Sequence, residues 1–227
     1  YTEQVQLAGW AAFDAGLNDR AARHFAASLA ASEEADDQAL VGNSLAFLAY
    51  QQAFHLSPDV DLAEASYERA ESAAPSRVLA LLLERLAFTY AVAGDVYETE
   101  RTLDLARASL RAAAGPLAPD WVSWVDETEM DIMAGRCWSQ LRRPLRAIPL
   151  LTSALSRYED SHARDKALYL SWLASSYADA GELEHAAAVT NRVVDLATGV
   201  ASERPWLRIL ELARRFVRNH RVRHTLD

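Results

Sequence analysis

The feature that most constrains this chain is a pattern of small and large residues that recurs along it. Small residues at helical spacing allow two helices to cross closely, and larger residues fill the space beside the crossing. Glycine suits the turn between the two helices. The pattern therefore predicts a helical hairpin, and its clearest copy reads Leu173-Ala174-x-x-Tyr177, then Gly181, then Ala186-x-x-x-Thr190-x-x-Val193.

Four further copies align with this one. Two of them are regular and contain a turn glycine. A less regular copy has Arg142 at the position of the turn glycine, and another keeps only its second helix, after a turn at Ser57-Pro58-Asp59. In chain order the copies are Ala8-Gly9-x-x-Ala12, Gly16 and Ala21-x-x-x-Phe25-x-x-Ser28; Ala63-x-x-x-Tyr67-x-x-Ala70; Leu86-Ala87-x-x-Tyr90, Gly94 and Thr99-x-x-x-Leu103-x-x-Ala106; Ala134-Gly135-x-x-Trp138 and Ala147-x-x-x-Leu151-x-x-Ala154.

This spacing is that of the tetratricopeptide repeat (TPR), although equivalent positions of successive copies (21, 63, 99, 147 and 186) lie farther apart than in the standard repeat of about 34 residues. We expect an all-α fold, a right-handed superhelix (α-solenoid) of about five TPR-like helical hairpins, in a single domain over residues 1–227. A capping helix is expected over about 204–219, because the last apolar face of a repeat array needs a cover. The repeats are expected over about 3–33, 37–74, 76–114, 120–158 and 162–199.

The composition of the chain excludes several other classes. With 51% hydrophobic residues and only 8 Gly and 7 Pro among 227, it is too apolar for a disordered segment and too poor in turn formers for an all-β fold. The net charge of −9 argues against nucleic-acid binding through the main body. The single Cys137 excludes an intramolecular disulfide, and no stretch is apolar enough to span a membrane. We expect a cytoplasmic protein with no membrane association.

Five segments, taken in order, resemble one known family over essentially the whole chain. They are Leu7-Ala8-Gly9-Trp10-Ala11-Ala12-Phe13-Asp14-Ala15-Gly16, Pro75-Ser76-Arg77-Val78-Leu79-Ala80-Leu81-Leu82, Trp121-x-x-Trp124-x-Asp126-Glu127-x-Glu129, Ala134-Gly135-Arg136-Cys137 and Asp165-Lys166-Ala167-Leu168-Tyr169-Leu170. They resemble the C-terminal TPR regulatory domain of actinobacterial transcription regulators that carry an N-terminal XRE-type helix-turn-helix. The architecture is also similar to that of the peptide-sensing receptors of the RRNPP group.

The resemblance implies a ligand-sensing and dimerising regulatory domain of a cytoplasmic transcription regulator. Only six residues precede Leu7, so we expect the chain to be a fragment, with DNA bound only through a domain absent from it. The expected assembly is a homodimer. The alternative is an interaction scaffold that binds a segment of a partner protein.

The first helices of a stacked array line its concave face, and this places a set of candidate ligand-binding residues there. The set mixes apolar surface with carboxylates and one guanidinium, which suits a peptide or a small amphipathic signal molecule. The aromatic and aliphatic members fit inter-repeat core equally well, and Gln51 is an alternative to Gln52 in the second repeat. The candidates are Gln6, Trp10, Phe13, Gln52, Glu84, Phe88, Glu129, Ile132, Arg136, Ser171, Ser175 and Asp179.

A long helix is expected from about Asp120, as N-cap, to Leu141. It would place Trp121 and Trp124 on one face, as an aromatic wall for a ligand or partner or as packing between repeats. Carboxylates at 126, 127, 129 and 131 suggest an acid/base pair or a metal site, but a solvated acidic face is favoured because no His lies near them.

Nothing in the chain indicates catalysis, a cofactor or a metal, since it has no phosphate loop and no nucleophile elbow. Cys137 is interpreted as a buried, inert thiol. The last helix is basic, and a stripe of Arg208, Arg215 and either Arg204 or Arg218 either contacts a second protomer or DNA, or complements the acidic body of its own chain. His220 and His224 lie in the same tail.

Overall fold

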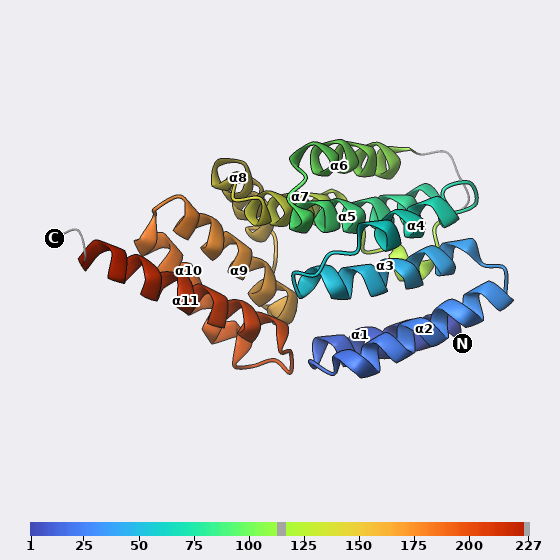
Figure 1. Cartoon of the computed structure of the whole chain (residues 1–227), viewed down its shortest axis with the longest axis horizontal. Coiled ribbons are helices and arrows are strands. Elements are labelled where there is room, and N and C mark those ends of the chain that lie inside the picture. Colours follow the sequence, from blue (N-terminus) through green and yellow to red (C-terminus); the bar gives the residue numbers. More distant parts are fainter. Residues whose placement is uncertain (113–116, 225–227) are drawn as a thin grey trace.

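Five helical hairpins follow one another in the computed structural model, which describes residues 1–112 and 117–224, with side chains described up to Arg214. Figure 1 shows the first three hairpins side by side at one end of the long axis of the molecule and the fifth at the other end, with the last helix packed against it. The hairpins are α1 (Thr2–Asp14) with α2 (Asn18–Glu34), α3 (Gln38–Phe54) with α4 (Val60–Ala70), α5 (Ser76–Ala93) with α6 (Val96–Arg111), α7 (Glu127–Gln140) with α8 (Pro144–Leu155), and α9 (Ala163–Asp179) with α10 (Leu183–Ala197); the last helix is α11 (Arg204–His224). The described ranges contain no strand, and the predicted all-α solenoid is confirmed.

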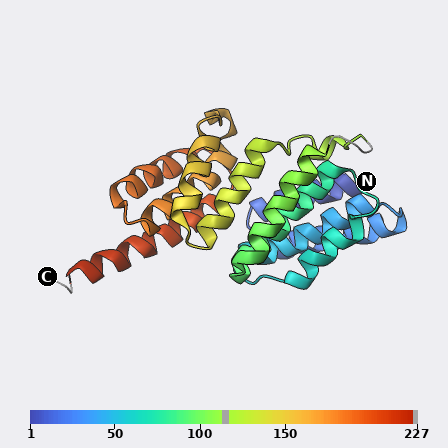
Figure 2. The same cartoon turned by 90° about the horizontal axis from the view of Figure 1, so that it is seen from above.

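The helices form two layers. The first helices α1, α3, α5, α7 and α9 each contact the next one and make the inner layer, while the second helices cover their outer side. The later part of α11 extends away from the hairpins (Figure 2). Within the described ranges, every helix is too short or too polar to cross a membrane.

Every hairpin turns through one residue with a positive φ angle. Three turns use glycine, at Gly16, Gly94 and Gly181, with φ between 75° and 86°. The other two use Leu56, with φ 60°, and Arg142, with φ 54°. A side chain in this left-handed region costs about 1–2 kcal/mol, so two turns keep the shared geometry at a conformational cost.

The crossing inside each hairpin follows the small-residue pattern. A Cβ atom on Gly9 would lie 2.5 Å from the Phe25 ring, and one on Gly135 would lie 2.5 Å from the Leu151 side chain. Only a residue without a side chain allows these helices to approach so closely. The equivalent positions of the second helices are at most 2% exposed, and they are Ala21, Ala63, Thr99, Ala147 and Ala186.

The helix expected from Asp120 begins later, and that prediction is wrong. Residues Asp120–Val122 form one 3-10 turn, and α7 starts only at Glu127. Asp126 is the N-cap, with an extended backbone and a carboxylate that accepts the Glu129 N–H at 2.9 Å. A helix begins at the residue after its N-cap, so the residues before Asp126 are not part of α7. Trp121 and Trp124 therefore do not share a helical face.

The two ends of the stack meet at one buried polar cluster, which we call the Asp14 clasp. The Asp14 carboxylate, at the end of α1, accepts from Ser202 at 3.0 Å and from two nitrogens of Arg204 at 2.7 and 2.6 Å. The Asp14 carbonyl also accepts the Glu203 N–H at 2.8 Å. Figure 1 shows the start of α11 beside the end of α1. The clasp therefore joins residues about 190 positions apart and closes one side of the inner face.

Candidate functional site

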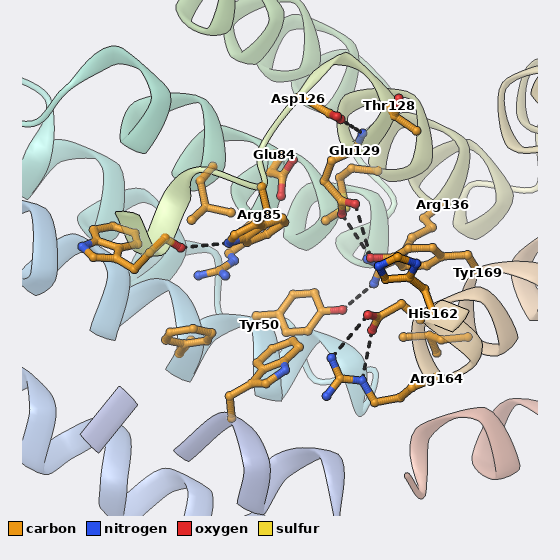
Figure 3. A pocket seen from close by; sticks show the side chains of 18 of the residues that line it. Tyr50, Glu84, Arg85, Asp126, Thr128, Glu129, Arg136, His162, Arg164 and Tyr169 are labelled. Carbon is orange, nitrogen blue, oxygen red and sulfur yellow. Dashed lines mark hydrogen bonds and ion pairs between the residues drawn. The ribbon is translucent and has the colours of Figure 1, made fainter. Parts of the chain in front are cut away.

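The inner face encloses a cavity of about 820 Å³. All five first helices contribute to its wall, together with the segments before α7 and before α9 and with Arg204 of the clasp. The volume lies within the range of small-molecule and short-peptide sites, about 300–1,000 Å³. Its lining alternates aromatic rings with charged groups, and Figure 3 shows the charged side chains around a common space.

A chain of amides and one guanidinium forms the wall on the side of α1, α3 and α5. Asn43 donates from Nδ2 to Oε1 of Gln6 at 2.7 Å and accepts at Oδ1 from Nη1 of Arg85 at 2.7 Å. The Arg85 guanidinium also lies over the Phe47 ring, 4.3 Å from its centroid. Burial lowers the pKa of Arg85 to about 10, although nearby Glu84 opposes that shift.

A second guanidinium, that of Arg136 on α7, lies within a cage of aromatic rings. Its central carbon is 4.9 Å from the Phe88 centroid and 5.6 Å from the Tyr50 centroid, and the rings of Tyr169 and Trp172 are each at 5.7 Å. Nη2 donates to the Tyr50 hydroxyl, whereas Nε is buried without a hydrogen-bond partner in the described part of the chain. Aromatic faces attract a desolvated cation, which helps to keep it buried.

Two carboxyl groups complete the inner end of the cavity. Glu84 is 1% exposed, and its Oε2 atom has no partner among the described residues. Burial, reinforced by the nearby Glu129 carboxylate, raises the pKa of Glu84 well above its usual 4.5. Glu129 accepts hydrogen bonds from Tyr158 at 3.3 Å and Tyr169 at 3.2 Å, but burial still raises its pKa. Both acids are therefore shifted toward their protonated forms.

The exposed part of the cavity wall carries charged residues, among them Glu3, Arg157 and Glu159, together with two apolar ones. Leu7 is 68% exposed there and Trp124 is 49% exposed. Trp124 donates from its indole to the Trp121 carbonyl at 2.9 Å, and both rings line the cavity. The rim of the cavity thus combines apolar and charged side chains.

Five of the twelve predicted groove residues line the cavity, and seven do not. Those in the wall are Gln6, Trp10, Glu84, Glu129 and Arg136. Phe13, Phe88 and Ile132 are at most 2% exposed and lie in the hydrophobic core. Gln52 is exposed near the end of α3, outside the cavity, while Gln51 donates to the Asn18 carbonyl.

Two of the three predicted residues on α9 are covered by the last helix. Arg208 of α11 donates to Ser171 at 3.4 Å and to Ser175 at 2.9 Å, and its guanidinium lies 3.7 Å from the Trp172 centroid. Asp179, partly buried, follows farther along the same helix. Only the first turns of α9 therefore reach the cavity, through Arg164, Asp165, Leu168 and Tyr169.

Sequence reasoning missed Asn43, Tyr50, Arg85 and Tyr169. The Glu84-Arg85 pair, set in the apolar run of 78–88, was the available clue, because adjacent charges in a buried helix cannot both face water. Tyr50 and Tyr169 gave no such clue, since an aromatic residue at helical spacing fits core packing equally well.

The remaining sequence interpretations concern groups outside this cavity. Glu127 and Asp131 both pair with Arg107 of α6, at 3.4 and 2.8 Å, so this part of the acidic face ties two hairpins together. Cys137 is fully buried, and burial raises the pKa of its thiol. No group of three His, Cys, Asp or Glu that could hold a metal occurs in the described ranges.

In the basic last helix, Arg204 and Arg208 both contact their own chain: Arg204 binds Asp14, and Arg208 reaches α9. The other members of the predicted stripe, Arg215 and Arg218, and the two tail histidines, His220 and His224, have side chains outside the described residues.

Comparisons with known proteins bear on the fold alone. No protein-family model and no curated protein matches the chain. Among solved structures it is similar to nearly identical TPR-like repeats from Podosopora anserina, described as a kinesin light chain, with 14% identity and a TM-score of 0.50 over 87% of this chain and 95% of that one. A variant of the same protein gives 14% identity and a TM-score of 0.51, over 86% and 93%. This chain has a TPR-like repeat fold. Fold likeness at such identity carries no information on ligands.

Proposed function

We propose that this chain is the ligand-binding regulatory domain of a transcription regulator and holds a short peptide or small amphipathic molecule in its inner cavity. The cavity itself is the observation that carries the proposal: it is about 820 Å³ in volume, and all five repeats contribute to it. A ligand that contacts every repeat binds one curvature of the solenoid better than others and shifts the population toward it. Such a shift can reposition whatever domain is attached.

The regulatory context rests on the sequence resemblance. That resemblance supports a DNA-binding domain outside this chain, a homodimeric assembly and a cytoplasmic location. The arrangement of the cavity adds a physical reason for sensing, because buried charged groups without partners are costly and a ligand can relieve that cost. An exposed aromatic rim alone would support only a general docking role.

The test is thermal unfolding of the chain in the presence of short-peptide pools and extracts of the producing organism. A ligand present at about 100 times its Kd stabilises the native state by about 2.7 kcal/mol, which raises the unfolding midpoint by several degrees. Thr128→Trp, in the cavity wall, should abolish the rise by filling the space. Thr152→Trp is the matched control, since Thr152 is exposed on α8 and lies outside the cavity.

Two results would contradict the proposal. One is an unchanged midpoint with every pool and extract. The other is a rise that survives in the Thr128→Trp variant, because the ligand would then bind elsewhere.

A partner-protein segment is the second candidate occupant, favoured by the exposed Leu7 and Trp124 at the mouth. Native mass spectrometry of the stabilised complex separates the two candidates. A small signal adds at most about a kilodalton to the 25.1 kDa chain, whereas a partner adds the mass of a protein.

A further inference from the structure

We infer that the inner end of the cavity is an oxyanion site, in which the guanidinium groups of Arg85 and Arg136 bind the carboxylate or phosphate group of the ligand. This inference rests on the proposed function, since it names the chemical class of the ligand that the cavity holds. It predicts a ligand with an apolar body and one negatively charged end.

The first observation is that these two buried cations have no ionic partner. Arg85 is 8% exposed and Arg136 is 3% exposed, and both line the cavity from first helices that contact each other. Their hydrogen bonds go to neutral groups, Oδ1 of Asn43 and the hydroxyl of Tyr50. Among the described residues, neither guanidinium has a carboxylate oxygen within 4 Å. Buried arginines are rarely left in this state, because a desolvated charge needs a counter-charge.

Arg204 provides a comparison within the same cavity wall. It is as buried as Arg136, at 3% exposed, and it also lies over an aromatic ring, that of Trp10, at 4.6 Å. Two of its nitrogens nevertheless contact the Asp14 carboxylate, at 2.6 and 2.7 Å. The chain thus supplies an acid where a buried arginine has a structural task. Arg85 and Arg136 receive none.

The two nearby acids do not fill that role. Glu84 contacts neither guanidinium within 4 Å and holds a partnerless Oε2 atom, and its raised pKa favours the neutral carboxylic acid. Glu129 is engaged by the hydroxyls of Tyr158 and Tyr169. Neither acid therefore forms a direct ion pair with Arg85 or Arg136, and Glu129 acts on Arg136 only from beyond 4 Å. An anionic ligand group supplies that pairing.

The donors available there suit an oxyanion. The Arg136 side chain lines the cavity, and the Tyr50 hydroxyl, which accepts from Arg136, still has its own proton to donate. Guanidinium groups bind carboxylates and phosphates through charge-assisted hydrogen bonds. Leu81, Met133 and Phe47 line the same cavity and supply the contact for an apolar body.

The experiment uses four probes that separate charge from shape. The first probe, N-acetyl-Phe-Leu, has one charged group, its carboxylate. The second, N-acetyl-Phe-Leu-amide, has the same shape and no charge, and the third, Phe-Leu-amide with a free amine, is cationic. Phenyl phosphate distinguishes a phosphate head group from a carboxylate. Each dissociation constant is measured by isothermal titration calorimetry on the wild-type chain. We expect N-acetyl-Phe-Leu or phenyl phosphate to bind at least about tenfold more tightly than the neutral amide, and the cationic probe to bind most weakly.

Variants then assign the preference to the two arginines. Arg85→Met and Arg136→Met remove the charge at similar volume and should each reduce the anion preference to about threefold or less. Arg85→Lys and Arg136→Lys keep the charge and should restore part of it. Arg23→Met is the matched control, because Arg23 is exposed on α2 outside the cavity, and it should bind the probes as the wild type does. Circular dichroism establishes that each variant is folded.

The wild-type probe order decides the inference even if a variant fails to fold. Equal binding of the acid, the phosphate and the amide would overturn the oxyanion site and leave the proposed function standing. Binding of none of the probes would overturn it as well. Failure of the proposed function is recognised separately, by peptide and extract ligands that still bind when Thr128→Trp fills the cavity or that never bind at all.

Discussion

The crossings inside the hairpins and the inner face of the first helices differ in the residue types that form them. Inside the hairpins, glycine and alanine recur at fixed spacing, and Ala21 and Ala147 are fully buried at equivalent positions. On the inner face the residue types differ from one helix to the next. For example, α5 contributes Glu84 and Arg85 to the cavity, and α3 contributes Asn43 and Tyr50. The first region is specified by shape alone. The second contains buried charged groups that the repeat pattern does not require. Under our proposal they are retained because they bind a ligand.

The largest expected effect tests whether polar contacts of the inner face also carry stability. Asp14→Ala leaves Arg204 buried without its partner, and we expect a loss of about 3–5 kcal/mol in the free energy of unfolding. Urea denaturation measures the loss. Asp195→Ala, at an exposed position of α10, is the control and should change the value by less than about 0.5 kcal/mol. A loss under about 1 kcal/mol in Asp14→Ala would show that the hairpin crossings hold the fold without the clasp.

The next effect belongs to a hairpin crossing. A Cβ at Gly42 would lie 2.6 Å from the Ser66 carbonyl oxygen, which is backbone and cannot rotate away. We expect Gly42→Ala to cost about 1–3 kcal/mol, because α3 and α4 must separate. Gly199→Ala is the control, since the nearest atom to its added Cβ would be 3.8 Å away. Thermal unfolding measures both variants, and the midpoint of Gly199→Ala should lie near that of the wild type. Equal midpoints for the two variants would contradict the role given to close crossing.

The smallest effect concerns pH and sharpens the contrast between the regions. The pKa of Glu84 is raised in the folded chain, so above its usual value of 4.5 the native state keeps a proton that the unfolded state releases. The contribution of Glu84 to the free energy of unfolding is therefore greatest below pH 4.5 and declines as the pH rises toward the pKa of the folded state. Glu84→Gln removes this titration, so its free energy of unfolding should rise relative to that of the wild type between pH 5 and pH 8. Urea denaturation at each pH measures the difference.

Glu68→Gln is the control for that series, because Glu68 is exposed on α4. Its stability should follow the wild type in parallel at every pH. If Glu84→Gln also runs parallel to the wild type, Glu84 does not bind a proton more tightly in the folded chain.

The same contrast explains how far the sequence could predict the structure. Local spacing encodes the hairpins, so five copies of one pattern were enough to predict the all-α solenoid, and Arg142 was placed at a turn. The start of α7 was missed because Asp120 and Asp126 are both acceptable N-caps, and only the contact with the Glu129 N–H decides between them. Ser171 and Ser175 were placed in the groove because nothing local shows that α11 covers them.

The candidate site depended on longer-range facts still. Gln6, Trp10, Glu84, Glu129 and Arg136 were found because each stands at a predictable place on a first helix. Arg85 lies next to Glu84, yet helical periodicity allows only one of two neighbours on a given face, and burial of both requires walls from other repeats. The contact between Asp14 and Arg204 spans most of the chain and leaves no trace in local spacing.

The Asp14 clasp also changes how the array should come apart. In an open solenoid each repeat contacts only its neighbours, so the end repeats fray first and unfolding spreads inward as along a one-dimensional lattice. A contact between the first helix and the start of the last one removes that independence. The array then behaves as a closed loop, in which opening either end requires breaking the clasp first. Amide exchange should accordingly be slowed in α1 and α9 as in α5, and should become graded from the ends when Asp14 is replaced.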